Sequence, residues 1–294
     1  MTGTKPTVHD LHSHSTASDG SLAPAELVRR AAEAGIDVLA LTDHDTTDGL
    51  AEAEAAARRM GLVLVPGVEI SVTWRKGTVH ILGLGIDRQS PVLQSGLQRL
   101  QAWRAWRAEE IGRRLEKAGI PDALAGARRH ARGRIVGRTH FARFLVESGR
   151  CKDMKTVFKR YLVKNRPGHV PGQWASLEEA VHWIREAGGQ AVIAHPARYG
   201  FTATRLRELI GEFMECGGTG LEVVSGSHDS RDISHMARVA SRHGLLASAG
   251  SDYHGPESPY IQLGRLPQLP GDCIPIWSAW NALVETKEAS ATAS

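Results

Sequence analysis

The chain has 294 residues, of which 41% are hydrophobic and 23% charged, and its formal net charge is +4. This composition is typical of a globular protein with a sizeable core. The sequence contains no run of roughly 20 apolar residues, the length that a membrane-spanning helix needs. The first six residues lack the apolar core of a signal peptide, and Cys151, Cys216 and Cys273 form no paired motif, so we expect a cytoplasmic protein without disulfides or a cysteine-bound zinc.

The first hundred residues alternate between strand and helix patterns. Apolar strand-like runs occupy residues 7–11, 37–42, 62–71 and 78–86. Helices are predicted at residues 24–35 and 46–61, and each ends at a glycine. This order of strands and helices indicates a parallel sheet with helical crossovers.

A different pattern occupies residues 101–175. One long helix is predicted at residues 91–117, and shorter helical pieces follow to about residue 163. Residues 101–175 contain 18 Lys and Arg against 6 Asp and Glu, a net charge of +12, whereas the remainder has 18 against 26, a net charge of −8. A basic module on an acidic body suggests an anionic ligand, with solvated arginine-rich helix faces as the alternative.

The alternation returns at Ser176, which forms a capping-box pattern with Glu179. Strands are predicted at residues 190–194, 220–224 and 245–249, and helices near residues 205–215 and 230–243. The simplest architecture is an α/β barrel of residues 1–100 and 176–294, interrupted by a basic, mainly helical insertion at residues 101–175. We expect the small polar residues 285–294 to be a disordered tail.

Histidines and carboxylates stand at or near the ends of most predicted strands. They are His12, His14, Asp19, Asp43, His44, Asp45, Glu69, His80, His195, Asp252 and His254. Strand ends are where barrel enzymes place their chemistry, and the pairs His12/His14 and Asp252/His254 have the i, i+2 spacing that puts both side chains on one face of an extended chain. Each motif alone is weak evidence for a metal, since one histidine on an apolar strand is more often a core residue. Their joint occurrence at successive strand ends predicts a metal site.

The ligand types narrow the choice of metal. Imidazole nitrogens and carboxylate oxygens suit Mn²⁺, Fe²⁺ or Zn²⁺. The ligands are too many for one ion, and two or three ions bridged by carboxylates would use them all. We therefore predict two or three divalent ions. The ligand types leave the three metals open, and Mn²⁺ is the one we expect.

Short motifs then carry a family resemblance. They lie at residues 10–14 (DLHSH), 18–20 (SDG), 41–45 (LTDHD), 66–71 (PGVEIS), 194–196 (AHP) and 250–254 (GSDYH). Together they resemble the PHP (polymerase and histidinol phosphatase) superfamily, which implies a distorted (β/α)7 TIM-like barrel. The insertion motifs at residues 137–145, 158–162 and 170–171 resemble the subgroup of 3′,5′-nucleotide bisphosphatases and the 5′→3′ exoribonuclease RNase AM.

The resemblance also implies which residues hold the metals. One ion would be held by His12, His14, Glu69 and Asp252, a second by Glu69, His80 and His195, and a third by Asp19, His44 and His254. Asp43 and Asp45 receive no such role, and an orienting role behind the ligands is plausible for them.

The implied reaction is removal of the 3′-phosphate from a nucleoside 3′,5′-bisphosphate, such as adenosine 3′,5′-bisphosphate, by a hydroxide that bridges the metals. Glu69, Asp252 and His254 are the predicted catalytic residues. His254 and a metal-bound water are both candidates for protonating the leaving oxygen. The sequence has no serine-nucleophile elbow or P-loop, which disfavours a covalent serine route and an ATPase.

Basic residues of the insertion are the candidates for gripping the second phosphate. They are Arg138, His140 and Lys164, with Arg134 and, outside the insertion, Arg198 behind them. Trp103, Trp106 and Trp174 could stack a base, although the helical spacing of the first two favours packing.

Other functions stay open at this point. The same hydroxide attack would serve a 5′→3′ exoribonuclease acting on short 5′-phosphorylated RNA. A histidinol phosphatase needs no basic insertion, and a non-catalytic PHP scaffold would not need a complete ligand set. We expect a small nucleotide or short RNA as the partner, and neither a membrane nor an obligate protein partner.

Overall fold

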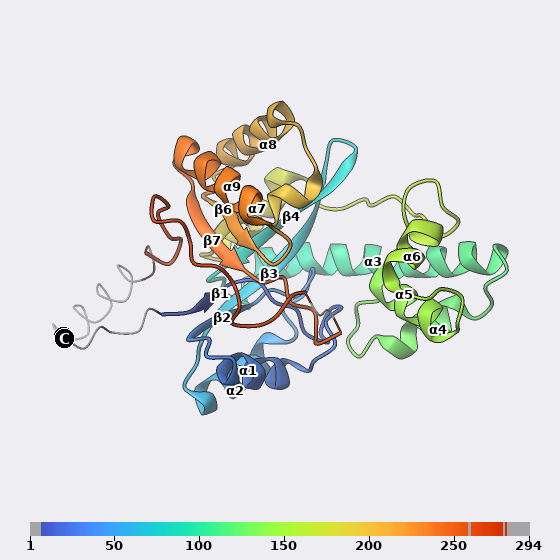
Figure 1. The fold of residues 1–294 in the computed structure, drawn as a ribbon. Coiled ribbons are helices and arrows are strands. Elements are labelled where there is room, and N and C mark those ends of the chain that lie inside the picture. The colour runs from blue at the N-terminus through green and yellow to red at the C-terminus, as the bar shows by residue number, and fades with distance from the viewer. Residues whose placement is uncertain (1–6, 258–259, 279, 281–294) are drawn as a thin grey trace.

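The computed structural model describes residues 7–257, 260–278 and 280, and in them seven strands form one sheet (Figure 1). In sheet order the strands are β1 (His9–Asp10), β2 (Val38–Leu41), β3 (Val63–Trp74), β4 (Gly77–Leu84), β5 (Gln190–Ile193), β6 (Gly220–Ser225) and β7 (Leu246–Gly250). The amide of Leu11 donates to the carbonyl of Ala249 at 2.9 Å, so the first and last strands meet and the sheet nearly closes. The predicted distorted barrel is confirmed.

The barrel departs from an all-parallel arrangement at one strand. β1, β2 and β3 pair in parallel, as do β5, β6 and β7, but β4 runs antiparallel to both of its neighbours. The carboxyl ends of the parallel strands therefore share one mouth of the barrel. Because β4 runs the other way, residues in its first half, such as His80 opposite Ser71, lie toward the same mouth.

Helices cover the outside of the barrel. They are α1 (Pro24–Glu33), α2 (Leu50–Met60), α7 (Leu177–Glu186), α8 (Ala203–Glu215) and α9 (Ser230–His243), with the short 3₁₀ helix η2 (Pro196–Tyr199) after β5. Their inner faces and the outward side chains of the strands form one apolar cluster that includes Leu27, Ile70 and Leu209. A second cluster, including Leu11, Val65 and Val192, fills the barrel interior away from the mouth. Burial of each such side chain stabilises the fold by about 1.5–3 kcal/mol.

Local sequence signals explain where the helices begin. The capping box is confirmed, because Ser176 Oγ accepts from the Glu179 amide at 3.1 Å and Glu179 Oε2 accepts from the Ser176 amide at 2.8 Å. The second helix begins at Leu50 rather than at the predicted residue 46. Thr46 Oγ1 instead accepts from the amide of Asp48 at 3.2 Å, a local turn that competes with the helix, and a turn at Asp48 and Gly49 leads into Leu50.

A lobe of helices stands beside the barrel. The long helix α3 (Pro91–Lys117) runs from the barrel into this lobe, which contains α4 (Ala123–His130), α5 (Arg138–Glu147), α6 (Met154–Val157) and the π-helical turn η1 (Phe158–Leu162) (Figure 1). Leu93 and Leu97 at the start of α3 belong to the barrel cluster, whereas Ile111 and Leu115 belong to a separate cluster inside the lobe. The helix thus crosses the predicted boundary at residue 100, and the division into two domains stays a prediction.

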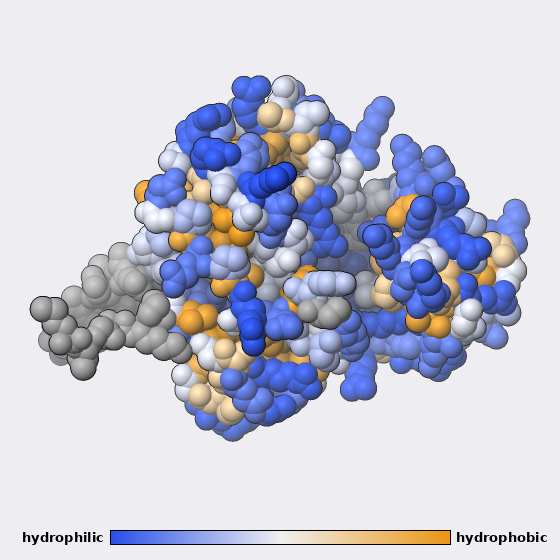
Figure 2. Space-filling view, in the orientation of Figure 1, coloured by the Kyte–Doolittle hydropathy of each residue, from blue (hydrophilic) through white to orange (hydrophobic). Residues whose placement is uncertain are grey.

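The surface of the lobe is mainly hydrophilic on the face shown in Figure 2, and a hollow separates the lobe from the barrel in that view. None of the helices in the described part of the chain has both the length and the apolar character needed to span a bilayer. The predicted disordered tail at residues 285–294 lies outside the described residues.

Candidate metal centre

Histidine and carboxylate side chains from the strands and the loops beyond them converge at the barrel mouth. The structure brings together all nine residues predicted as ligands: His12, His14, Asp19, His44, Glu69, His80, His195, Asp252 and His254. They form four overlapping groups, in each of which the candidate ligand atoms lie within 4.8 Å of one another. Such spacing lets several atoms reach a shared cation.

Glu69 lies at the middle of the cluster and is fully buried on β3. Its Oε1 lies 2.9 Å from His80 Nδ1 and 3.1 Å from His195 Nε2. Its Oε2 lies 2.8 Å from His44 Nδ1 and 3.3 Å from His14 Nε2. One carboxylate thus faces four rings with its two oxygens, which is the arrangement of a ligand shared between neighbouring cations.

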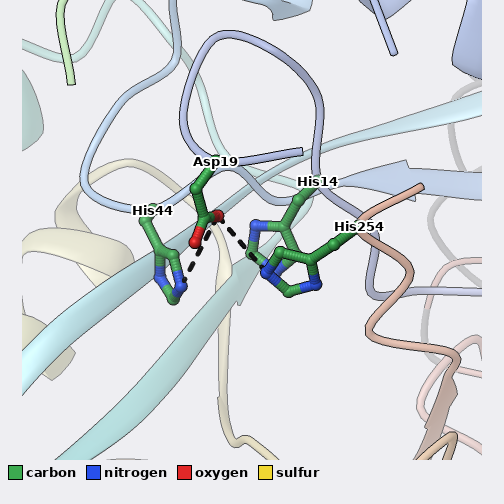
Figure 3. A group of neighbouring side chains, drawn as sticks. All are labelled: His14, Asp19, His44 and His254. Atoms are coloured by element: carbon green, nitrogen blue, oxygen red, sulfur yellow. Dashed lines mark ion pairs between the residues drawn. The ribbon is translucent and has the colours of Figure 1, made fainter. Parts of the chain in front are cut away.

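A second carboxylate, Asp19, faces the outer part of the cluster. Figure 3 shows its side chain between the rings of His44 and His254, with His14 beside them. Asp19 Oδ1 lies 3.3 Å from His254 Nε2 and 4.0 Å from His44 Nε2. The insertion holds this residue, since Thr139 donates to Asp19 Oδ2 at 2.9 Å and Arg143 donates to the Asp19 carbonyl at 3.0 Å.

The deepest part of the cluster joins the two ends of the barrel sheet. The Nε2 atoms of His12 and His14 lie 3.1 Å apart, and both approach Asp252 Oδ1, at 3.4 Å and 3.2 Å. The amide of Asp252 donates to the carbonyl of His12 at 2.9 Å, which fixes the loop after β7 against the loop after β1. Asp252 has φ of 57°, a left-handed conformation that costs a non-glycine residue free energy and often marks a functional site.

Several buried atoms of the cluster approach each other closely without hydrogen-bond geometry. Asp19 Oδ1, His44 Nδ1, Glu69 Oε2 and His80 Nδ1 are buried and have no hydrogen-bond partner in the described residues. Buried polar atoms are rarely left in this state. Their lone pairs and the nitrogen and oxygen donor set fit divalent ions such as Mn²⁺, Fe²⁺ or Zn²⁺.

The electrostatics of the carboxylates agree with this fit. Burial alone would raise the pKa of Glu69, but the rings of His44, His80 and His12 outweigh it and hold that pKa well below its usual range. Histidine neighbours lower the pKa values of Asp252 and Asp19 well below normal against the same effect of burial. The three buried carboxylates therefore carry charge at neutral pH, and buried charges require cationic partners.

Asp43 and Asp45 lie behind the cluster and hold its loops. Asp43 accepts from the hydroxyls of Ser15 and Ser18, each at 2.6 Å, and so fixes the loop that carries Asp19. Asp45 accepts from the amide of Ser71 at 2.7 Å and from Arg104 Nε at 2.6 Å. These contacts fit the orienting role considered for both residues. The contact between Asp45 and Arg104 also ties α3 to the barrel mouth.

A cavity of about 220 Å³ opens above the cluster, between the barrel and the lobe. The candidate ligands form part of its wall, and the rest includes Arg104, Arg107, Arg138, Phe158 and Trp174. Of the predicted substrate-binding residues, Arg138 and Arg198 line this cavity.

The other predicted substrate-binding residues lie elsewhere. Lys164 is exposed and is not part of the cavity lining, and Arg134 forms an ion pair with Asp48 at 2.8 Å. His140 is buried, and its Nδ1 accepts from the amide of Gly137 at 3.0 Å, which caps the start of α5.

Trp103 and Trp106 stack on each other, with ring centroids 4.5 Å apart, away from the cavity lining. Trp174 does line the cavity, with the guanidinium groups of Arg104 and Arg107 lying 4.9 Å and 5.3 Å from its ring centroid.

Two arginines of the cavity wall have no acidic partner. Arg104 is paired with Asp45 and Arg198 with Asp252, but neither Arg107 nor Arg138 forms an ion pair within the described residues. Burial, together with Arg138 and Arg104, lowers the pKa of Arg107 to about 9, so this group is still charged at neutral pH. Two uncompensated cations beside the cluster make an anion-binding wall.

Sequence reasoning missed Arg107, Thr139 and Glu222. Arg107 and Thr139 lie among many similar residues of the insertion, and no local pattern separates them from their neighbours. Glu222 did carry a signal, because it is the lone charged residue in the apolar run of β6 and is fully buried. A buried carboxylate of this kind requires a partner in the folded chain.

Comparisons with known proteins agree with this site. The sequence profile of the PHP domain matches residues 10–125. The chain is 51% identical to a 3′,5′-nucleoside bisphosphate phosphatase of Chromobacterium violaceum, over 94% of this chain and 97% of that protein. It is 45% identical to the 5′-3′ exoribonuclease Rnm of Escherichia coli K12, over 96% of each chain.

Two solved structures resemble this chain over most of its length. A protein from Chromobacterium violaceum described as an amidohydrolase, with bound sulfate and no metal, is 51% identical and superposes with a TM-score of 0.90, covering 93% of this chain and 96% of that one. A protein from Bifidobacterium adolescentis, assigned as a metal-dependent phosphoesterase, is 29% identical and has a TM-score of 0.80, covering 89% and 92%.

Proposed function

The chain belongs to the PHP-domain family of metal-dependent phosphoesterases, and from that premise we propose that it removes the 3′-phosphate from a nucleoside 3′,5′-bisphosphate. One observation carries the choice of substrate: the cavity above the ligand cluster also contains two charged arginines, Arg107 and Arg138, which have no acidic partner among the described residues. A substrate with two phosphates would place one at the cluster and the other against these arginines.

In this proposal the nine clustered residues hold two or three divalent ions. His12, His14, Glu69 and Asp252 would hold one, Glu69 with His80 and His195 a second, and Asp19 with His44 and His254 a third. The groups of ligand atoms around Asp252 and around Asp19 support the first and third sets. The second set is supported by Glu69 Oε1, which lies 2.9 Å from His80 Nδ1 and 3.1 Å from His195 Nε2. When bound, the ions supply a nucleophilic water at neutral pH and neutralise charge on the phosphoryl oxygens. Manganese as the metal and the cytoplasm as the location are proposals of the same kind.

The chain's own residues would orient the substrate and manage the proton. Arg107 donates through Nε and Nη2 to the carbonyl of Val170, at 3.1 Å and 2.9 Å, which fixes its guanidinium in the cavity wall. His254 lines the same cavity, and Asp19 and Asp252 outweigh the effect of burial and raise its pKa to about 9. That pKa applies to the metal-free ring, so His254 would donate a proton to the departing ribose oxygen only while its Nε2 is free of metal. With a metal bound there, a water would be the donor.

The test compares two substrates that differ only in the second phosphate. With Mn²⁺ present, Arg107→Met and Arg138→Met are each expected to raise KM for adenosine 3′,5′-bisphosphate roughly 10- to 100-fold, the loss for a hydrogen bond to a charged group. KM for adenosine 3′-monophosphate should stay near that of the parent. Arg113→Met is the matched control, because Arg113 lies on the same helix, is exposed and pairs with Glu110.

Equal changes for both substrates would show that these arginines do not recognise the second phosphate. Phosphate release from histidinol phosphate alone would overturn the proposed substrate altogether.

A 5′→3′ exoribonuclease is the second candidate function. The net charge of +12 in residues 101–175 and the likeness to Rnm over nearly the whole chain favour it. The two functions are distinguished by adding a short 5′-phosphorylated oligoribonucleotide to the same assay and measuring the nucleotides released. An exoribonuclease would release nucleotides from it. A non-catalytic scaffold is disfavoured, because the nine ligand positions are all filled by residues able to bind metal.

A further inference from the structure

The fully buried carboxylate of Glu222 on β6 contacts two of the candidate ligand residues at once. Its Oε1 lies 2.9 Å from His12 Nδ1, and its Oε2 accepts from the backbone amide of His195 at 2.5 Å. No Lys or Arg pairs with it among the residues that the structure describes. Its partners are thus a ring and a backbone amide that belong to the metal centre.

We propose that Glu222 is a positioning residue, whose carboxylate fixes the proton of His12 on Nδ1 and so aims the bare Nε2 of that ring at the metal centre. The inference rests on the proposed metal-dependent function. A carboxylate accepts hydrogen bonds, so Nδ1 must donate, and in the neutral ring that binds a metal Nε2 then carries no proton. Metal-ligating histidines are commonly fixed by a carboxylate in this way.

The position of His12 Nε2 supports this role. It lies 3.1 Å from His14 Nε2, 3.4 Å from Asp252 Oδ1 and 3.5 Å from Glu69 Oε1, so it faces atoms of both deep ligand groups. Among the other clustered rings, the Nδ1 atoms of His14, His44, His80 and His195 have no hydrogen-bond partner in the described chain. His254 Nδ1 bonds only a backbone carbonyl, that of Asp252. Within the described part of the chain, only at His12 does a carboxylate outside the ligand set hydrogen-bond to a clustered ring.

The second contact of Glu222 acts on the backbone. His195 has φ of 31° and ψ of 55°, a left-handed conformation that costs free energy in a non-glycine residue. The hydrogen bond from its amide to Glu222 Oε2 helps to hold this conformation, which places the ring 3.1 Å from Glu69. Glu222 therefore links the ligand after β1 to the ligand after β5.

The substitution Glu222→Gln separates this role from simple packing. The amide of His195 can only donate, so the glutamine oxygen must face it, and the glutamine NH₂ then faces His12 Nδ1. That contact requires Nδ1 to accept, which moves the ring proton to Nε2 and blocks the metal. We expect affinity for Mn²⁺ to fall roughly 10- to 100-fold, the usual loss when such a partner is changed.

The experiment measures Mn²⁺ binding to metal-free protein by competition with a chelator, beside the thermal unfolding of the metal-free form. Ser248→Ala is the matched control, since Ser248 is buried opposite Glu222 on β7 and its hydroxyl has no partner in the described residues. The control should bind Mn²⁺ like the parent, while Glu222→Gln binds more weakly with an unfolding temperature close to the parent's.

A double-mutant cycle decides the case even if Glu222→Gln lowers stability. In a His12→Ala background the same substitution should cost much less Mn²⁺ affinity, because the ring that it misdirects is absent. An equal loss in both backgrounds, or undiminished affinity in Glu222→Gln, overturns the proposed role. If the parent protein itself binds none of Mn²⁺, Fe²⁺ and Zn²⁺, the proposed metal-dependent function fails rather than the role of Glu222.

Discussion

At the scale of single residues, close packing around His12 leaves no room for a side chain at Gly250, the last residue of β7. A Cβ at this position would lie 2.3 Å from His12 Cβ, 2.7 Å from the His12 amide nitrogen and 2.8 Å from Glu222 Oε1. Two of these atoms belong to rigid parts of the metal centre, so the backbone must move to accept an added methyl group.

We therefore predict that Gly250→Ala destabilises the protein by about 1–3 kcal/mol, the usual cost of overpacking, and weakens Mn²⁺ binding because His12 is displaced. Urea unfolding and the chelator competition measure the two effects. Gly211→Ala is the control, since nothing lies within 4 Å of an added Cβ there and Gly211 lies inside α8. It should stabilise the protein by about 0.5–1 kcal/mol, and a similar gain from Gly250→Ala would contradict the packing argument.

Chain geometry predicted that histidines and carboxylates cluster at the barrel mouth, whereas the choice of ligands among them came from the family resemblance. Residues that directly follow parallel strands meet at one mouth, so His12, His195 and Asp252 could be grouped without knowing any contact. The roles of Glu222 and Arg107 depend on which side chain stands opposite them in the folded chain. Sequence spacing holds no information on such pairs, because 210 residues separate Glu222 from His12.

At the scale of secondary-structure elements, the start of α5 depends on a neutral histidine. His140 is the third residue of the helix, and its Nδ1 accepts from the amide of Gly137, the residue that precedes the helix. Burial lowers the pKa of His140 to about 4, with Arg143 and His130 acting in the same direction and Asp19 against it. A protonated ring could not accept this hydrogen bond, so the cap is lost when the ring is charged.

The sign of the resulting pH dependence follows from the proton balance. Between pH 4 and 6.5 the unfolded chain binds a proton at His140 that the folded chain does not, so the stability from this group is complete above pH 6.5 and is lost as pH falls toward 4. The full effect is about 3 kcal/mol. Urea unfolding of the metal-free protein at pH 7.5 and pH 5 should therefore show a smaller loss of stability for His140→Gln than for the parent.

Glutamine at this position can still accept from the Gly137 amide, as in a capping box, but it does not titrate. The other histidines are present in both proteins, so the difference between the two pH profiles isolates His140. Parallel profiles would mean that the proton uptake of this ring is not linked to folding.

The elements also show where local sequence patterns stop being informative. The capping box at Ser176 acts through neighbouring residues and was predicted correctly. The strand β1 was predicted at residues 7–11 but pairs only over His9–Asp10. Beyond Asp10 the chain leaves the strand and forms the loop that carries His12 and His14. The turn η1 adopts π-helical hydrogen bonding, which no periodicity in this short segment indicates.

At the scale of the whole molecule, α3 determines how the two parts of the chain act on one substrate. Its first turns pack on the barrel and its last turns pack in the lobe, and between them Arg104 and Arg107 face the cavity. The barrel carries the acidic excess and the ligands, and the lobe carries the basic excess. This distribution would draw the proposed anionic substrate to the junction of the two parts, where Arg107 and Arg138 have no acidic partner among the described residues.

This charge distribution distinguishes a nucleotide from an RNA chain. The proposed nucleoside bisphosphate would contact the cavity alone, whereas an RNA chain leaving the cavity would cross the basic lobe and make further phosphate contacts. Each phosphate neutralised on a single strand adds about 0.7 to the slope of affinity against salt on logarithmic axes. With three extra contacts, KM for a 5′-phosphorylated hexaribonucleotide should rise roughly 10- to 20-fold more than KM for the bisphosphate between 50 and 200 mM salt.

The substitution Lys164→Gln tests whether the RNA chain crosses the lobe near this residue. Lys164 is an exposed basic residue of the lobe, five positions before His169, which lines the cavity. Removing this charge should reduce the salt slope for the oligonucleotide by about 0.7 and leave that for the bisphosphate unchanged. Lys76→Gln, in the turn between β3 and β4, is the control for net charge. Identical salt slopes for both substrates in the parent protein would mean that the lobe carries no RNA path, and its charge would then serve the nucleotide alone.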